Sequence, residues 1–128
     1  MKILNSARGR FLKVALLGVA MLILPIQSYA RDVSFVWTAN TEPVTGYKLY
    51  YKAGTDGAPP YQGKGLPAGD APIVLGNVTS YTVTGLSPTE TYQFVLTAYN
   101  GVEESTYSAV VSVLPGSSPT IIRITKKS

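Results

Sequence analysis

The sequence predicts an all-β protein built as a two-sheet antiparallel sandwich. Two observations support this: short stretches alternate apolar and polar residues with a period of two, and turn residues separate them. Beyond residue 30, no 3.6-residue periodicity persists for more than one turn. Short strands that follow one another without helices between them are typical of sandwiches.

The strands can be placed from the alternation. The first predicted strand carries Val33, Phe35 and Trp37 on one face, and a polar loop with Pro43 and Gly46 ends it. A Gly/Pro-rich stretch at 54–70 is expected to form a long loop, because it cannot sustain regular pairing. Strands are expected, in order, at residues 33–38, 47–52, 73–75, 81–84, 92–99 and 107–114.

The longest predicted strand begins with a distinctive turn. Leu86, Ser87 and Pro88 precede Tyr92, and the chain then alternates strictly up to Tyr99. A tyrosine placed after such a turn is the pattern of a tyrosine corner, in which the phenol bonds the backbone a few residues upstream. The hydroxyl of Tyr92 is therefore expected to fix the crossing between the two sheets.

Five segments taken together resemble a fibronectin type III domain over about residues 32–115, in the form found in small secreted bacterial proteins. The resemblance implies an immunoglobulin-like sandwich with Trp37, Tyr47, Leu86 and Tyr92 as structural core residues. The matching segments are Val36-Trp37, Gly46–Tyr51, Thr79–Leu86, the strand from Tyr92, and Ser105–Ser108.

Two departures from the family pattern concern the ends of the chain. The family's first strand is missing before Val33, and the chain continues past residue 116 into an apolar segment at 120–126. Ile122 and Ile124 alternate with Ile121 and Arg123, which favours an extra C-terminal strand; the alternative is a frayed tail. We expect this strand to fold back as a hairpin on the strand at 107–114. The edge of the Trp37 strand would then stay open to strand addition and self-association.

The first thirty residues have the organisation of a secretory signal peptide. A basic region without acids precedes the 13-residue apolar run 14–26, and Ser28-Tyr29-Ala30 offers a cleavage site. The alternative is an uncleaved anchor, but a spanning helix needs about 20 apolar residues. The predicted domains are thus a signal peptide at 1–30, a fibronectin type III domain at 31–116 and a tail at 117–128. The mature protein is expected to be secreted or periplasmic, with membrane contact only through the signal.

Composition excludes several function classes. The chain has 11 basic and 7 acidic residues, but four of the basic ones lie within residues 1–30. The segment 32–115 holds three lysines and seven acids, which is unlike the basic surface of a nucleic-acid-binding protein. The absence of His and Cys leaves no imidazole or thiolate for catalysis or soft metals. No enzyme activity, metal or cofactor is expected.

The predicted outward face of the central strands suggests an interaction surface. Tyr50, Val95, Tyr99 and Val110 would form a partly apolar exposed patch, although surface tyrosines also occur simply because they favour strands. The leading hypothesis is an exported, non-catalytic module that binds a protein or assembles on the cell surface. The alternative is an accessory carbohydrate-binding module with Tyr50, Tyr61 and Tyr99 as stacking platforms.

Overall fold

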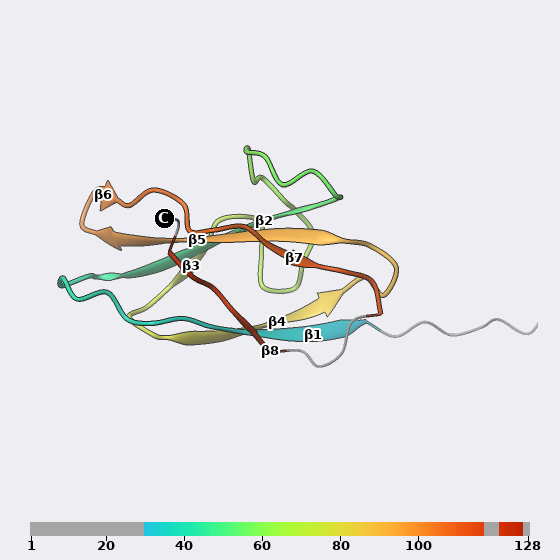
Figure 1. Cartoon of the computed structure of the whole chain (residues 1–128), viewed down its shortest axis with the longest axis horizontal. Coiled ribbons are helices and arrows are strands. Elements are labelled where there is room, and N and C mark those ends of the chain that lie inside the picture. Colours follow the sequence, from blue (N-terminus) through green and yellow to red (C-terminus); the bar gives the residue numbers. More distant parts are fainter. Residues whose placement is uncertain (1–29, 117–120, 127–128) are drawn as a thin grey trace, which may run out of the picture.

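The computed structural model describes residues 30–116 and 121–126. The predicted signal peptide therefore lies outside the described residues, apart from Ala30. The described chain is all-β and forms two sheets packed face to face, as the sequence predicts (Figure 1). Its strands are β1 (Arg31–Val36), β2 (Gly46–Ala53), β3 (Ile73–Leu75), β4 (Ser80–Leu86), β5 (Tyr92–Asn100), β6 (Glu103–Glu104), β7 (Val111–Val113) and β8 (Ile121–Arg123).

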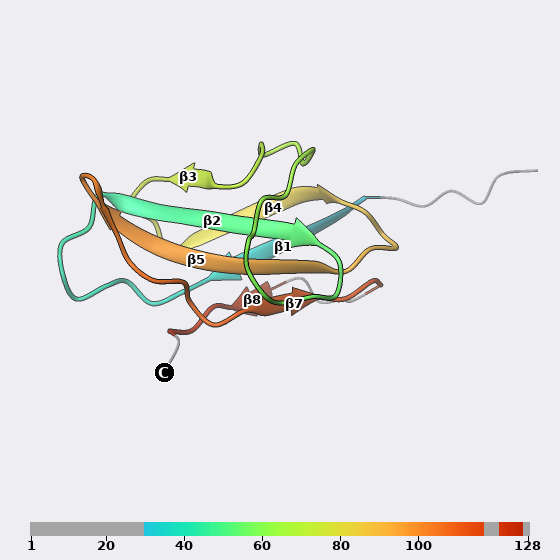
Figure 2. The same ribbon diagram turned by 90° about the horizontal axis from the view of Figure 1, so that it is seen from above.

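The two sheets have different connectivity. The three-stranded sheet has the order β4-β1-β8, and the five-stranded sheet has the order β3-β2-β5-β6, with β7 also pairing with β5. The longest ladder joins β2 and β5, antiparallel, from Gly46 opposite Tyr99 to Ala53 opposite Tyr92. This ladder runs through the middle of the larger sheet, as Figure 2 shows from above.

The predicted alternation of β5 determines the core. Tyr92, Phe94, Leu96 and Ala98 point between the sheets and are buried. Phe35 of β1 meets Phe94 with a ring-centroid distance of 4.6 Å, and Tyr51 of β2 packs on the same ring. Aromatic contacts of this kind add to the stabilisation from buried apolar area. The inter-sheet layer is thus continuous from β1 to β5.

The tyrosine corner forms at the start of β5. The backbone N–H of Ser87 donates to the hydroxyl of Tyr92 at 3.0 Å, and Leu86 is fully buried beside it. The guanidinium of Arg31 donates to the carbonyls of Ser87, Glu90 and Leu114. These bonds hold the start of β1, the β4–β5 turn and the chain just after β7 together at one end of the sandwich.

The C-terminal segment forms a strand, but its predicted position is wrong. Instead of folding back on β7, β8 pairs in parallel with β1, with Ser34 opposite Ile121 and Val36 opposite Arg123. The reason is the location of the chain end after β7. Arg31 binds the Leu114 carbonyl, so the chain leaves β7 next to the start of β1 and then runs in the same direction as β1. The edge of the Trp37 strand is therefore covered by the tail.

The tail also joins the two sheets. Beyond β8, the N–H of Ile124 donates to the Val36 carbonyl, and the Thr125 carbonyl accepts from the N–H of Ala109, in the segment that leads into β7 of the other sheet. Ile124 is 4 % exposed and packs in the core, whereas Ile121 is 68 % exposed. In Figure 1 the tail runs from the lower sheet up to the upper one. The tail thus closes one side of the sandwich.

The two isoleucines of the tail provide a matched test of this packing. We expect Ile124→Ala to lower the free energy of unfolding by about 2–4 kcal/mol, because the substitution removes a buried branched side chain. Ile121→Ala should change it by less than about 0.5 kcal/mol, because that side chain is exposed. Urea unfolding of both variants measures the difference, and equal effects of the two would contradict the observed packing.

Candidate functional site

The outer face of the β2–β5 ladder is not the exposed apolar patch that the sequence predicts. Val95 points outward from this sheet, as expected, yet it is fully buried. Gln93 and Thr97, which flank Val95 on the same face, are only 2 % and 3 % exposed. Val110 is 41 % exposed, whereas Tyr50 and Tyr99 are half-buried. The proposed patch of Tyr50, Val95, Tyr99 and Val110 is therefore not one open surface.

The loop after β2 covers this face. In Figure 1 it rises on the side of the larger sheet that faces away from the smaller one. Gly57 approaches Gln93 and Val110, and the ammonium of Lys52 donates to the Ala58 carbonyl. Tyr61 is 3 % exposed, its ring lies edge-on to Tyr107 at 5.1 Å, and Tyr107 in turn packs on Tyr50 at 5.3 Å. The expectation that Tyr61 is an open stacking platform is therefore wrong.

A hydrogen-bond network fixes the remaining polar groups of this face. The Glu104 carboxylate of β6 accepts from the Lys48 ammonium at 3.0 Å, from the Tyr50 hydroxyl at 2.5 Å and from the Thr97 hydroxyl at 2.9 Å. Partial burial alone would raise the pKa of Glu104, but these three donors outweigh burial and lower it. Burial and the bond to Glu104 raise the pKa of the Tyr50 hydroxyl. The Lys48 ammonium also lies 5.3 Å from the centre of the Tyr99 ring.

Trp37 and Tyr47, assigned to the core from the sequence, are buried and pack edge to face at 5.4 Å. The Tyr47 hydroxyl accepts a hydrogen bond from the backbone N–H of Asn40. Within residues 30–116 and 121–126, the indole N–H of Trp37 is the one buried side-chain nitrogen or oxygen that has no hydrogen-bond partner. A buried donor without an acceptor costs about 1–3 kcal/mol.

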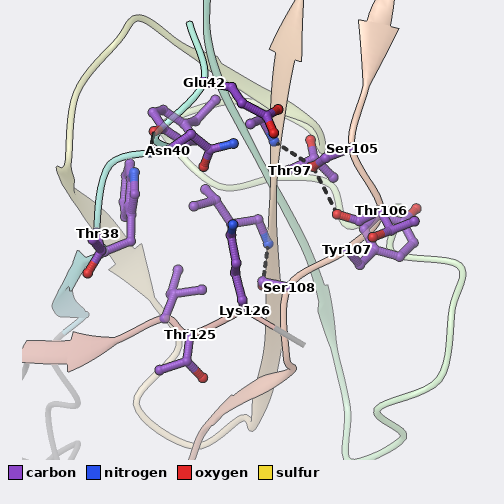
Figure 3. Close-up of a pocket in the computed structure, with 15 residues that line it drawn as sticks. Thr38, Asn40, Glu42, Thr97, Ser105, Thr106, Tyr107, Ser108, Thr125 and Lys126 are labelled. Atoms are coloured by element: carbon purple, nitrogen blue, oxygen red, sulfur yellow. Dashed lines mark hydrogen bonds between the residues drawn. The ribbon is translucent and has the colours of Figure 1, made fainter. Parts of the chain in front are cut away.

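Trp37 lines a groove of about 350 Å³, which we call the seam groove. It lies beside the hydrogen bond between Ala109 and Thr125, and Ser108 and Thr125 are among its lining residues. Its polar side chains come from three segments, 38–42 after β1, 105–108 after β6 and 125–126 in the tail, and from Thr97 of β5 (Figure 3). Its apolar residues are Trp37, Tyr47, Leu96, Ala98 and Ile124.

Two serines build one wall of the seam groove. The sequence predicts a strand through residues 107–114, but the backbone leaves the β5 ladder between β6 and β7. The hydroxyl of Ser105 accepts from the Ala98 N–H and donates to the Thr106 carbonyl, and Ser108 connects the Leu96 N–H to the Ala109 carbonyl in the same way (Figure 3). Each hydroxyl thus accepts the hydrogen bond from a β5 amide that a backbone carbonyl would accept in a regular ladder, while the chain bends away from β5.

The seam groove combines apolar surface with hydroxyls, one amide (Asn40), one carboxylate (Glu42) and one ammonium (Lys126). Such a mixture, with a few polar groups around apolar surface, is common in binding pockets. Among the described residues, no group of three or more acidic side chains could hold a metal ion, and there is no helix long and apolar enough to cross a membrane.

The sequence comparisons agree with this architecture. The fibronectin type III domain family matches residues 23–113, and the chain belongs to this family. Domains of this family generally lack catalytic activity and commonly serve in protein interaction or as scaffolds. A Kelch domain-containing protein of Saccharolobus solfataricus is 49 % identical over 47 residues, which are 37 % of this chain and 6 % of that protein. The chain thus spans a small fraction of that relative's length. None of the solved structures matches the chain.

The network around Glu104 gives a pH prediction. Because the folded state lowers the pKa of this carboxyl, its stabilising contribution is present above the ordinary glutamate pKa of about 4.3 and is lost as the pH falls through the lower folded value. We expect Glu104→Gln to destabilise the domain by about 1 kcal/mol at pH 7 and by less as the pH falls below about 4.

Glu103→Gln serves as the matched control, because its neighbour Glu104 provides the acceptor in this network. Urea unfolding of both variants from pH 7 to pH 3 measures the effect. A loss of stability in Glu104→Gln that stays constant over this range would contradict the role of the carboxylate.

Proposed function

We propose that this chain is an exported, non-catalytic protein-interaction module of a bacterial envelope, and that the seam groove is where a protein partner binds. The observation that carries this proposal is the lining of the groove, which sets the side chains of Trp37, Leu96 and Ile124 beside hydroxyls, an amide and an ammonium. A partner that covers this apolar surface and bonds the polar groups around it gains from both.

The groove suits an extended protein segment. Trp37, Leu96 and Ile124 offer apolar surface for one side chain of the partner. The backbone groups beside that side chain can bond the surrounding hydroxyls, such as that of Thr106, and the Asn40 amide. A groove of about 350 Å³ is large enough for such an anchor residue.

Carbohydrate binding through the three tyrosines has less support. Tyr61 is buried, and the Tyr50 ring packs against Tyr107 and bonds Glu104 through its hydroxyl. The Tyr99 ring lies beneath the Lys48 ammonium. Stacking on a sugar needs an open aromatic face, and the contacts of these tyrosines are made within the domain.

Catalysis is disfavoured by the composition of the site. The chain has no His or Cys, and Glu42 is the only carboxylate among the groove residues. General acid–base or nucleophilic chemistry relies on paired groups held within hydrogen-bond reach of each other. A single carboxylate among hydroxyls suits binding better than turnover.

Export rests on the signal-like segment and fits the start of the domain. The described fold begins with β1 at Arg31, directly after the proposed cleavage site at Ala30. Cleavage there would leave β1 and the contacts of the Arg31 guanidinium intact. A secreted or periplasmic location follows from this proposal.

A crosslinking experiment combined with fluorescence tests the function. A photo-reactive residue at Thr106, on the rim of the groove, should capture a specific envelope protein, whereas the same residue at Val74 on β3 should not. The chain has a single tryptophan, so its emission reports directly on the seam groove. The purified partner should shift the emission of Trp37, and Asn40→Ala should weaken binding by about threefold or more.

Two outcomes would contradict the proposal. One is capture of the same proteins from Thr106 and from Val74. The other is a shift of Trp37 emission by oligosaccharides and not by the captured protein, which would favour the carbohydrate-binding alternative.

A further inference from the structure

Strand β4 lies at the edge of the smaller sheet opposite the tail. Its neighbour on one side is β1, and among residues 30–116 and 121–126 no strand pairs with its other side. β4 is seven residues long. A strand at the edge of a sheet presents unpaired N–H and C=O groups that can bind another strand.

The pairing with β1 identifies these groups. The N–H of Trp37 donates to the Thr79 carbonyl, so this opposite pair is hydrogen-bonded. In an antiparallel ladder such pairs alternate with pairs whose backbone groups point away from each other. The backbone groups of Tyr81 and Val83 therefore face β1, whereas those of Ser80 and Thr82 point to the free edge; the register shifts after Val83, where Thr84 and Gly85 form a β-bulge. The bond from Ile124 to Val36, on the far side of β1, agrees with this alternation.

From Ser80 to Val83 the free edge of β4 carries neither a charge nor a proline, and its β-bulge lies further along, near the end of the strand. No charged residue occurs from residue 71 through residue 89, and β4 contains no proline. The other edges are short or carry protecting residues: β3 follows Pro72, β6 consists of two glutamates, and β8 ends at Arg123. Ser80, Thr82 and Thr84 are exposed. A neutral edge rich in β-branched residues favours pairing with another strand.

We propose that β4 pairs antiparallel with β4 of a second copy of this chain, about a two-fold axis at Thr82. Thr82 of one copy then exchanges both backbone hydrogen bonds with Thr82 of the other, and Ser80 pairs with Thr84. The two smaller sheets become one continuous sheet across the dimer. This proposal goes beyond the seam groove, which is formed by other residues.

A second copy fits this edge because the edge is self-complementary. A two-fold axis brings the same surface of both subunits together, so like charges near the axis would repel one another. The side chains that meet here are hydroxyls, and Thr82 already shares a hydrogen bond of 2.7 Å with Ser34. Threonine and serine facing each other across strands are favourable pairs.

Site-directed crosslinking tests the register. The chain has no cysteine, so single-cysteine variants react at one position only. Thr82→Cys should form covalent dimers with a short thiol crosslinker. Ser80→Cys and Thr84→Cys should crosslink when mixed. Thr84→Cys alone should not, because two copies of residue 84 would lie roughly 13 Å apart along the strands. Val74→Cys, on the exposed edge strand β3, is the control and should give no dimer.

Sedimentation of the protein from Arg31 to Ser128 tests association without a crosslinker. We expect a concentration-dependent dimer, and Thr82→Lys should raise its dissociation constant by at least about tenfold, because two ammonium groups would meet at the axis. Val74→Lys adds the same charge on β3 and should leave the dimer unchanged. Equal crosslinking of Thr82→Cys and Val74→Cys, a strict monomer at millimolar concentration, or a dimer insensitive to Thr82→Lys would each overturn the proposal.

Discussion

The pairing of the tail with β1 determines much of this structure. Ile124 donates to Val36 on one sheet, and Thr125 accepts from Ala109 on the other. These two bonds join the sheets at one side of the sandwich and place the Ile124 side chain in the core. Without the tail, the far side of β1 would lack a strand partner among the described residues.

The same pairing shapes both proposed surfaces. The bond between Ala109 and Thr125 links the chain before β7 to the tail, and the seam groove, lined by Trp37, lies beside it. Ser105 and Ser108 allow the chain to bend away from β5 without leaving the amides of Ala98 and Leu96 unpaired. Because β8 occupies the far side of β1, the edges of the smaller sheet are the short β8 and the seven-residue β4. One surface is therefore a groove between sheets, and the other is a strand edge.

The features that sequence analysis predicted correctly depend on local pattern. The alternation of β5 correctly places Phe94 inward and Val95 outward. The Tyr92 hydroxyl forms the expected hydrogen bond to the backbone N–H of Ser87 in the preceding turn. Period-two patterns specify the face to which a side chain points, because successive residues of a strand point to opposite sides. They do not specify what covers that face. Val95 and Gln93 point outward and are nevertheless buried, and Gln93 lies against the loop after β2, which has no periodicity of its own.

The tail and the seam groove depend on contacts that are distant in sequence. Arg31 reaches the Leu114 carbonyl, and this contact decides which side of the sandwich the tail enters. The sequence favours a tight hairpin on β7, because a turn depends only on neighbouring residues. The sequence does not show where β7 ends relative to β1. The spacing of Ser105 and Ser108 is a sequence signal for the groove wall. Residues three apart in a regular strand point to opposite faces of the sheet, so the two hydroxyls could not both bond amides of β5 in the same way. That spacing indicates a bend rather than a continuous strand.

The closure of the sandwich by the tail can be measured directly by NMR of the isotope-labelled protein. Scalar couplings across hydrogen bonds should connect the Ile124 nitrogen to the Val36 carbonyl carbon and the Ala109 nitrogen to the Thr125 carbonyl carbon. The amide of Ile124 should also exchange with solvent slowly, like those of β5. Fast exchange at Ile124, together with contacts from the tail to β7 alone, would contradict the account.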